Sequence, residues 1–245
     1  MTVKILKQFN SQNFDNRSKN TKIKYIILHY TETENLNQAV KILCDKIKKV
    51  SSHYVIDHDG MIYQLVDDSF RAWHAGISYW KKDINLNDNS IGIEIVNKGE
   101  LSKNKFSDLQ IEKLIGLLQS LIDKYQISKY NILGHSDVAP TRKIDPGILF
   151  PWKQLFSLSI GLPVYTYNKK INFCPLDSLT LHKFFKNLEY IGYSQIEVKK
   201  NLNKKNLSIV NAFHRHFYPK LLGRNPSHTS FEISEKLKQN LKKKV

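Results

Sequence analysis

The segment KYIILHYT (residues 24–31) is a short apolar run rich in β-branched and aromatic side chains, and it predicts a buried β-strand. A second strand is predicted for SIGIEIV (90–96), in which the isoleucines face one side and Glu94 faces the other. NIL (131–133) predicts a third, shorter strand that leads directly into His135. Each strand therefore delivers a polar, chemically useful residue at or near its carboxyl end.

Two amphipathic helices are predicted between these strands. One covers about residues 35–49, and the other begins at Ser107, where Gln110 is placed to complete a capping box. Their apolar stripes contain Leu36, Ala39, Val40, Leu43 and Ile47 in the first helix, and Ile111, Leu114, Ile115, Leu118, Ile122 and Tyr125 in the second. HYVID and MIYQLV flank a His-Asp-Gly turn at 58–60 and predict a hairpin. This alternation predicts an α/β domain with a mixed central β-sheet flanked by helices.

Past Pro163 the pattern changes to helices alone. Three apolar stripes at helical spacing are present, of which the first ends at Gly192 and the third begins at Thr229 with Glu232 as its capping partner. These stripes predict a small all-helical domain. The resulting boundaries are residues 1–160 for the α/β domain, 161–175 for a linker and 176–245 for the helical domain.

Composition places the chain among globular proteins. Of its 245 residues 41% are apolar, which is enough for a packed core, and no run approaches the roughly 18 consecutive apolar residues of a membrane span. The N-terminus lacks an apolar signal region, so the expected location is the cytoplasm; the periplasm or cell envelope is the alternative if the chain is a mature form or leaves by another route. Cys44 and Cys174 are expected to be free and buried, and they supply no metal site.

The formal net charge is +16, and residues 181–245 carry 14 Lys+Arg against 4 Asp+Glu, or +10 of it. Such a charge can attract nucleic acid or another anionic polymer. A general bias toward Lys, Asn and Ile is the alternative explanation, and no nucleic-acid motif accompanies the charge. No nucleic-acid partner is therefore expected.

The segment GHSDVAPTRKIDPG (134–147) combines turn residues with groups that can perform chemistry. A turn would explain its proline and glycine residues. However, His29 and His135 both follow predicted apolar strands, where ligand sites of α/β sheets gather. Together with Asp145 they can provide the three protein ligands of a catalytic zinc site. If the segment is extended, Lys143 lies on the same face as Asp145, where a cation would stabilise negative charge on a carbonyl oxygen.

Two further features can contribute to such a site. Glu94 places a charge on an otherwise apolar strand, which is costly unless the carboxylate is paired or functional. A structural salt bridge is one explanation; beside two histidines, an aspartate and a lysine, a general base is the other. The loop of Trp73, His74 and Gly76 is either a packed tryptophan with a turn or a substrate-recognition element, in which His74 binds a carbonyl or hydroxyl.

The order of these segments resembles that in the zinc-dependent N-acetylmuramoyl-L-alanine amidases, the amidase-2 family related to peptidoglycan recognition proteins. The matching pieces span about residues 24–152 and are IILHYT, SSHYVID, YQLV, AWHAGIS, LNDNSIGIEIVN and GHSDVAPTRKIDPGILFPW. LEYIGYS and VNAFHRHFYP, within about residues 175–241, resemble the C-terminal peptidoglycan-binding-like module of the AmiD type. This second resemblance is weaker in its motifs.

The resemblance implies a function and roles for individual residues. One Zn²⁺ per chain would be held by His29, His135 and Asp145, with Glu94 as general base and Lys143 as the partner of the oxyanion. Substrate-binding residues would be His74, Asn87 and Trp73. The reaction implied is hydrolysis of the amide between the lactyl group of N-acetylmuramic acid, ordinary or 1,6-anhydro, and L-alanine of the peptidoglycan stem peptide, in bacterial cell wall degradation or recycling.

Two expectations concern partners. Peptidoglycan or a muropeptide is the expected partner, and the chain is expected to be a monomer. The alternative function is a non-catalytic module that binds muropeptide without cleaving it. Because such modules usually lack one zinc ligand and all three are present here, the enzyme is favoured.

Overall fold

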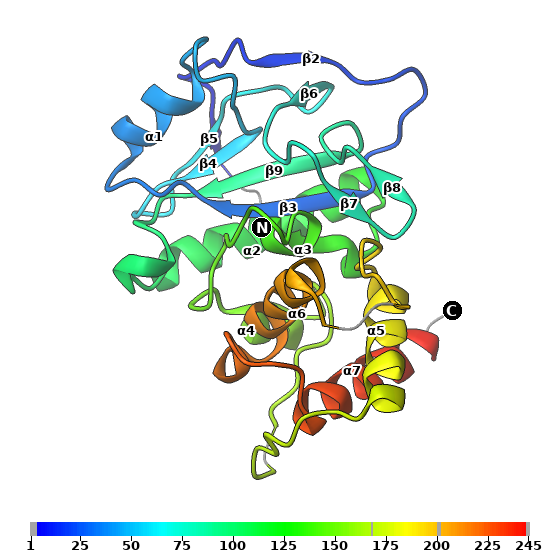
Figure 1. Ribbon diagram of the computed structural model, residues 1–245. Coiled ribbons are helices and arrows are strands. Elements are labelled where there is room, and N and C mark those ends of the chain that lie inside the picture. The colour runs from blue at the N-terminus through cyan, green and yellow to red at the C-terminus, as the bar shows by residue number, and fades with distance from the viewer. Residues whose placement is uncertain (1–3, 168, 200–201, 244–245) are drawn as a thin grey trace.

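A six-stranded mixed sheet forms the centre of the molecule in the computed structural model, which describes residues 4–167, 169–199 and 202–243 (Figure 1). In spatial order the strands are β1 (Ile5–Leu6), β5 (Ile62–Gln64), β4 (Tyr54–Ile56), β9 (Ser90–Ile95), β3 (Tyr25–Tyr30) and β10 (Ile132–Gly134). Neighbours are parallel except β4 and β5, which form the predicted hairpin. Two short antiparallel pairs are separate: β2 (Phe14–Asn16) with β6 (Phe70–Ala72), and β7 (Tyr79–Trp80) with β8 (Asp83–Ile84). The predicted mixed sheet is confirmed.

Helix α2 (Asp108–Tyr125) covers one face of this sheet. It begins at the predicted capping box, in which Ser107 accepts from the Gln110 N–H and the Gln110 side chain accepts from the Ser107 N–H. Its buried leucines and isoleucines pack against alternate residues of β3 and β9, including Ile26 and Ile93. The opposite face of β3 and β9 carries Tyr25, Ile27, His29, Ser90, Gly92 and Glu94, so the polar residues lie away from α2.

Helix α1 (Leu36–Leu43) is shorter than the predicted 35–49, and that prediction is wrong at its C-terminal end. The N-terminal segment binds the end of α1 and the loop after it: the Ser11 hydroxyl donates to the Leu43 carbonyl, and the Asn13 amide donates to the carbonyls of Asp45 and Val50 beyond the helix. These long-range bonds satisfy the helix end and turn the chain away, which periodicity alone could not reveal.

The C-terminal part forms a helical unit of α5 (Ser178–Ile191), α6 (Lys204–Phe217) and α7 (His228–Lys242), below the sheet in Figure 1. Gly192 caps α5 as predicted. The predicted start of α7 is wrong by two residues, because Ser227 is the N-cap and Thr229 lies buried inside the first turn. The remaining short elements are α4 (Trp152–Ser157) and the 3₁₀ turns η1 (Glu100–Ser102), η2 (Lys129–Asn131) and η3 (Pro219–Leu221).

The helical unit shares a hydrophobic core with the sheet. One buried cluster joins Tyr25 and Ile27 of β3 to Phe184 of α5 and Phe213 of α6. Gly192 lies against the Trp80 ring so closely that a Cβ there would meet it at 2.3 Å. The predicted boundaries near residues 160 and 175 stay a prediction, and their outer ends at residues 1 and 245 lie outside the described residues.

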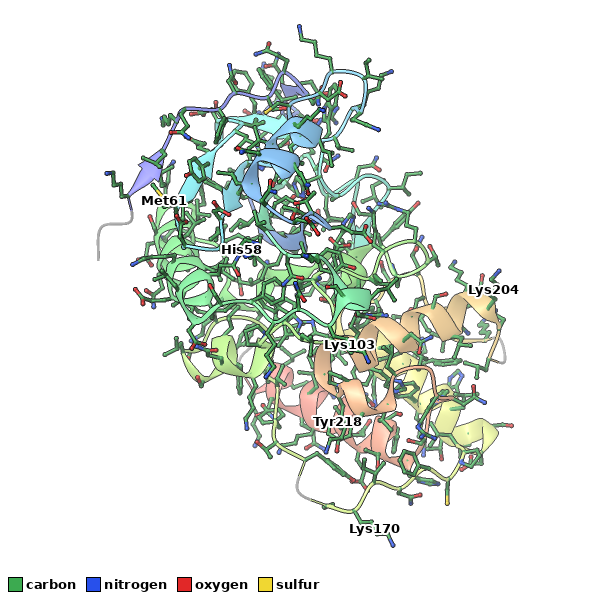
Figure 2. All side chains as sticks on the ribbon, turned by 90° about the vertical axis from the view of Figure 1, so that its left-hand side faces the viewer. His58, Met61, Lys103, Lys170, Lys204 and Tyr218 are labelled. Atoms are coloured by element: carbon green, nitrogen blue, oxygen red, sulfur yellow. The ribbon has the colours of Figure 1, made fainter. Side chains whose placement is uncertain are left out.

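Other sequence-based expectations have mixed outcomes. Both cysteines are free as expected, but Cys174 is exposed and Cys44 half-buried, so the expectation of two buried thiols is wrong. Among the described residues, no helix combines the length and apolar character needed to cross a membrane. Figure 2 shows Lys170 and Lys204 at the outer edge of the helical unit, where their charges are solvated.

Candidate active site

The strand register brings the predicted site residues to one edge of the sheet. In the parallel ladder of β3 and β9, His29 lies directly beside Glu94. Gly134, the last residue of β10, pairs with Leu28, so His135 opens helix α3 (His135–Val138) at the level of His29. Because register partners point to the same face of a sheet, His29 and Glu94 project into the same space.

The segment after His135 folds back and delivers Asp145. The Ser136 N–H donates to the Asp145 carbonyl at 2.9 Å, which places the Asp145 side chain beside the His135 ring. Nδ1 of His29 lies 3.0 Å from Nδ1 of His135, and Oδ2 of Asp145 lies 2.9 and 3.0 Å from these two nitrogens. All three residues are buried. Ligand atoms of a tetrahedral zinc site are about 3.3 Å apart, so the triangle has nearly the size that zinc requires.

The Ser90 hydroxyl group determines which ring nitrogens of His74 and His29 donate hydrogen bonds. Ser90 donates its hydroxyl proton to the Leu86 carbonyl, so its oxygen accepts from Nε2–H of His74 at 3.1 Å. Burial, with repulsion from His29, holds the pKa of His74 well below its usual value, so the ring is neutral and its Nδ1 accepts. His29 therefore donates through Nε2 to Nδ1 of His74 at 3.1 Å and turns the Nδ1 lone pair toward Asp145.

His135 is oriented in the same sense by a backbone carbonyl. Its Nε2 donates to the Ala75 oxygen at 3.1 Å, which leaves the Nδ1 lone pair facing His29. The same carbonyl accepts from Arg142, whose guanidinium also donates to the Ile77 carbonyl at 2.7 Å. Two imidazole lone pairs and a carboxylate oxygen thus converge without a proton between them, an arrangement that a cation stabilises. The donor set fits a zinc ion, because metal-binding histidines commonly donate their second N–H to such partners.

The charge state of His29 agrees with metal binding. Burial, then repulsion from His135, lowers the pKa of His29 to about 4, so its ring is neutral near pH 7. A neutral imidazole, whose lone pair is free, is the form of histidine that binds a divalent metal.

Glu94 has the environment expected of a general base. Its Oε2 atom is buried and has no hydrogen-bond partner among the described residues. Glu94 also forms no salt bridge with any of these residues. The salt-bridge explanation of this charge is therefore not supported. Burial, with repulsion from Asp145, raises the pKa of Glu94 well above its usual range, while Lys143 opposes that rise. A carboxyl with a raised pKa can accept a proton and release it again near neutral pH.

These groups line a cavity of about 170 Å³. Lys143 is exposed at this cavity, and Trp73 forms part of its wall. The apolar side of the cavity is formed by Ala39, Ile42, Leu43 and Val50. It therefore combines acid, base, cation and apolar surface in one place.

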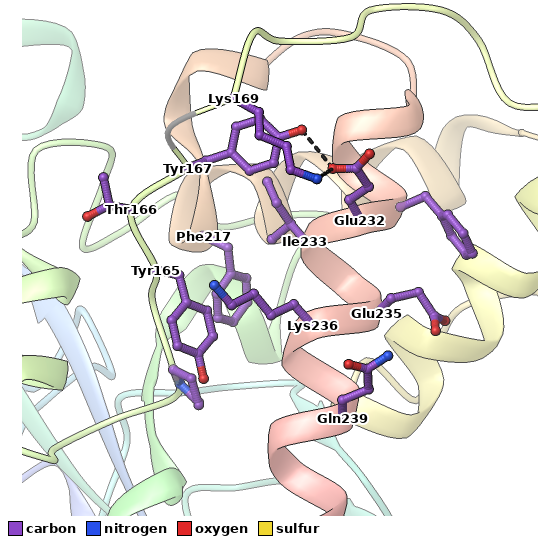
Figure 3. A pocket seen from close by; sticks show the side chains of 12 residues that line it. Tyr165, Thr166, Tyr167, Lys169, Phe217, Glu232, Ile233, Glu235, Lys236 and Gln239 are labelled. Atoms are coloured by element: carbon purple, nitrogen blue, oxygen red, sulfur yellow. Dashed lines mark hydrogen bonds and ion pairs between the residues drawn. The ribbon is translucent and has the colours of Figure 1, made fainter.

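A larger cavity of about 530 Å³ lies between α7 and the chain at residues 163–167 and Lys169 (Figure 3). Both of its carboxylates are already bound: Glu232 accepts from the Tyr167 hydroxyl at 2.8 Å and lies 3.5 Å from the Lys169 ammonium, and Glu235 accepts from the Asn187 amide. No histidine lines it, and the candidate metal triangle is not part of it. The chemistry thus selects the smaller cavity as the candidate active site.

The three substrate-binding residues expected from the resemblance differ in how far their polar atoms are engaged inside the protein. Trp73 and His74 both line the cavity, but both ring nitrogens of His74 are hydrogen-bonded inside the protein, to His29 and Ser90. The Asn87 side-chain oxygen accepts from the N–H groups of His74 and Ala75, at 3.1 and 2.6 Å. Polar atoms of His74 and Asn87 therefore shape the loop that borders the cavity.

Two contributors were missed in the sequence, Ser90 and the Ala75 carbonyl. Ser90 shares the face of β9 with Glu94, two steps of the strand period away, and this alternation was its available signal. Gly92, between them, makes room for His74: a Cβ there would lie 2.4 Å from Cγ of the His74 ring. A backbone carbonyl such as that of Ala75 leaves no signal in a sequence.

The comparisons with known proteins converge on one family. A family model described as N-acetylmuramoyl-L-alanine amidase matches residues 19–148. The chain is 34% identical over 238 residues to N-acetylmuramoyl-L-alanine amidase AmiD from Escherichia coli K12, covering 88% of this chain and 82% of that protein.

Two solved structures are similar over most of their length. One is E. coli AmiD in complex with the substrate anhydro-N-acetylmuramic acid-L-Ala-D-γ-Glu-L-Lys, with a TM-score of 0.77, 31% identity, and coverage of 92% of this chain and 93% of the other. The other is AmpDh3 from Pseudomonas aeruginosa in complex with anhydromuramic pentapeptide, with a TM-score of 0.72, 25% identity, and coverage of 95% and 98%. Both likenesses therefore extend into the helical unit.

Proposed function

The chain belongs to the N-acetylmuramoyl-L-alanine amidase family, and we propose that it uses zinc to hydrolyse the amide between the lactyl group of N-acetylmuramic acid, in its ordinary or 1,6-anhydro form, and L-alanine of the stem peptide. The observation that carries the zinc assignment is the triangle of His29, His135 and Asp145 beside the unpaired carboxyl of Glu94. The substrate named for the similar AmiD structure contains this amide.

The proposed mechanism divides the work among few side chains. His29, His135 and Asp145 would hold the zinc ion, which when bound supplies Lewis acidity toward the carbonyl and lowers the pKa of water. Glu94 accepts a proton from the attacking water and delivers it to the departing alanine nitrogen. The Lys143 ammonium stabilises the negative charge that develops on the carbonyl oxygen. Trp73 would contribute a wall for the muropeptide.

The function is tested by following peptide release from a muropeptide. We expect the purified protein with zinc to release the stem peptide and a chelator to abolish release, because the triangle supplies no nucleophile of its own. Added zinc should restore the rate. The products are identified by mass spectrometry. Binding of the muropeptide without any released peptide, in the presence of zinc, would contradict the proposal and favour a non-catalytic binding module.

His74 is proposed to act through His29, because its ring nitrogens are engaged with His29 and Ser90. We expect His74→Phe to weaken zinc affinity by about tenfold or more, since the ring that orients a metal-binding histidine typically contributes 10–100-fold. Zinc affinity is measured by chelator competition, and KM for the muropeptide is measured for the same variant.

Trp73→Phe is the matched variant for this test, because Trp73 lines the cavity and, among the described residues, makes no hydrogen bond to the triangle. It should raise KM and leave zinc affinity unchanged. The reverse pattern, with His74→Phe changing KM alone, would return His74 to the role of a substrate-binding residue.

A further inference from the structure

Asp137 is a buried carboxylate two residues after His135, and the helical unit supplies two of its three hydrogen bonds. Its oxygens accept from the Gly134 N–H at 2.8 Å, from the Tyr193 hydroxyl at 2.7 Å and from Nδ1 of His216 at 2.8 Å. Tyr193 follows α5, and His216 lies near the end of α6, which lies next to α3 in Figure 1. Helix α3, which begins with the proposed metal ligand His135, is thus held by hydrogen bonds from the C-terminal part of the chain.

The bond to Asp137 is the one hydrogen bond that the His216 side chain makes within the described residues. Its ring is stacked between Trp152, at a centroid distance of 3.9 Å, and Phe217, at 4.2 Å. Its Nε2 is buried and has no partner among the described residues. An apolar ring would fill this space without an unpaired nitrogen, so the polar contribution of His216 is its bond to Asp137.

The neighbouring residue of α6 reaches the other end of the same segment. Arg215 forms a bidentate ion pair with Glu100, at 2.8 and 3.2 Å, and both side chains are largely buried. Glu100 in turn accepts from the Ile148 N–H at 3.0 Å, three residues after Asp145. Bidentate pairs of this kind fix orientation as well as distance.

We propose that α6 and Tyr193 position the segment of residues 134–148, which carries His135, Lys143 and Asp145. His216 and Tyr193 hold its start through Asp137, and Arg215 holds its end through Glu100. The helical unit is then part of the amidase machinery, as a support for the metal ligands, whatever else it binds. The catalytic consequence rests on the proposed function, whereas the consequence for zinc binding does not.

The test removes single hydrogen bonds without removing rings. Tyr193→Phe and His216→Phe delete the two side-chain donors to Asp137. Tyr167→Phe is the matched control, because it deletes a tyrosine bond to Glu232, a carboxylate of α7 that makes no hydrogen bond to the segment among the described residues. His216→Asn keeps a donor near the position of Nδ1. For each variant of the 245-residue chain, zinc affinity is measured by chelator competition, together with kcat, KM and Tm.

We expect Tyr193→Phe and His216→Phe each to weaken zinc affinity and lower kcat by about tenfold, with KM within twofold. Tyr167→Phe should leave zinc affinity and kcat unchanged, and His216→Asn should recover most of the loss. A lower Tm with unchanged zinc affinity and kcat would overturn the proposal, because a merely structural role would do only that. If the wild-type protein binds zinc but releases no peptide, the proposed function fails, and the zinc affinities still decide the positioning role.

Discussion

Glu94→Gln is expected to lower kcat for muropeptide cleavage by about a thousandfold while zinc remains bound. Glutamine has nearly the shape of glutamate but cannot accept the proton of the attacking water, and general base catalysis of this kind typically contributes 10²–10⁴-fold. Glu94 lies beside the triangle in the strand register, yet it contributes no atom to it. Zinc content after purification and kcat at saturating substrate measure the two halves of the prediction.

Glu32→Gln is the matched control for this variant. Glu32 is exposed and lines the same cavity, so its change removes one negative charge from the cavity without touching the proposed base. Its kcat should stay within about threefold of the wild-type value. If Glu94→Gln retains more than a tenth of the wild-type kcat, another group accepts the proton.

The thermal stability of the metal-free protein provides a second readout for Glu94→Gln. Because burial and Asp145 raise the pKa of Glu94, the folded metal-free protein binds this proton more tightly than the unfolded chain does. Its stability therefore falls as pH rises from the unfolded value near 4.5 through the raised folded value. Glutamine carries no such charge, so metal-free Glu94→Gln should have a Tm about 3 °C or more above wild type at pH 8, and the gap should close near pH 4.

Local sequence signals sufficed where a structure depends on neighbouring residues. Periodicity and a capping box located α2, and alternation located the strand that carries Glu94. The end of α1 and the start of α7 were placed wrongly. The first depends on Ser11 and Asn13, which lie more than 30 residues away in sequence. Packing partners at such separations leave no local pattern.

The candidate site, like the fold, could be predicted only in part from the sequence. His29, His135 and Asp145 could be named from strand ends and spacing, and the structure brings their ligand atoms within 3.0 Å of one another. The hydrogen-bond partners that orient the two rings could not be predicted, because they are a serine hydroxyl, a backbone carbonyl and His74, for which the sequence suggested substrate binding. A sequence indicates which side chains can perform chemistry, but the hydrogen-bond partners that orient these side chains are determined by the three-dimensional fold.

Lys143→Ala is expected to lower kcat by about a hundredfold or more while zinc stays bound. One donor to a developing oxyanion contributes roughly 2.7–4 kcal/mol in comparable sites. The neighbouring Arg142 cannot replace it, because its guanidinium is bound to the carbonyls of Ala75 and Ile77. Lys153→Ala, an exposed lysine of α4 that does not line the cavity, controls for the loss of one positive charge toward an anionic substrate.

The pH profile separates an oxyanion partner from a residue that only attracts substrate. Lys143 lowers the pKa of Glu94, so its removal should move the acidic limb of kcat to higher pH, because ionising Glu94 becomes harder without a nearby cation. Loss of simple attraction would instead raise KM, respond to salt and leave kcat and its pH profile in place. Near-normal kcat in Lys143→Ala would remove Lys143 from the mechanism and leave the zinc ion alone to stabilise the oxyanion.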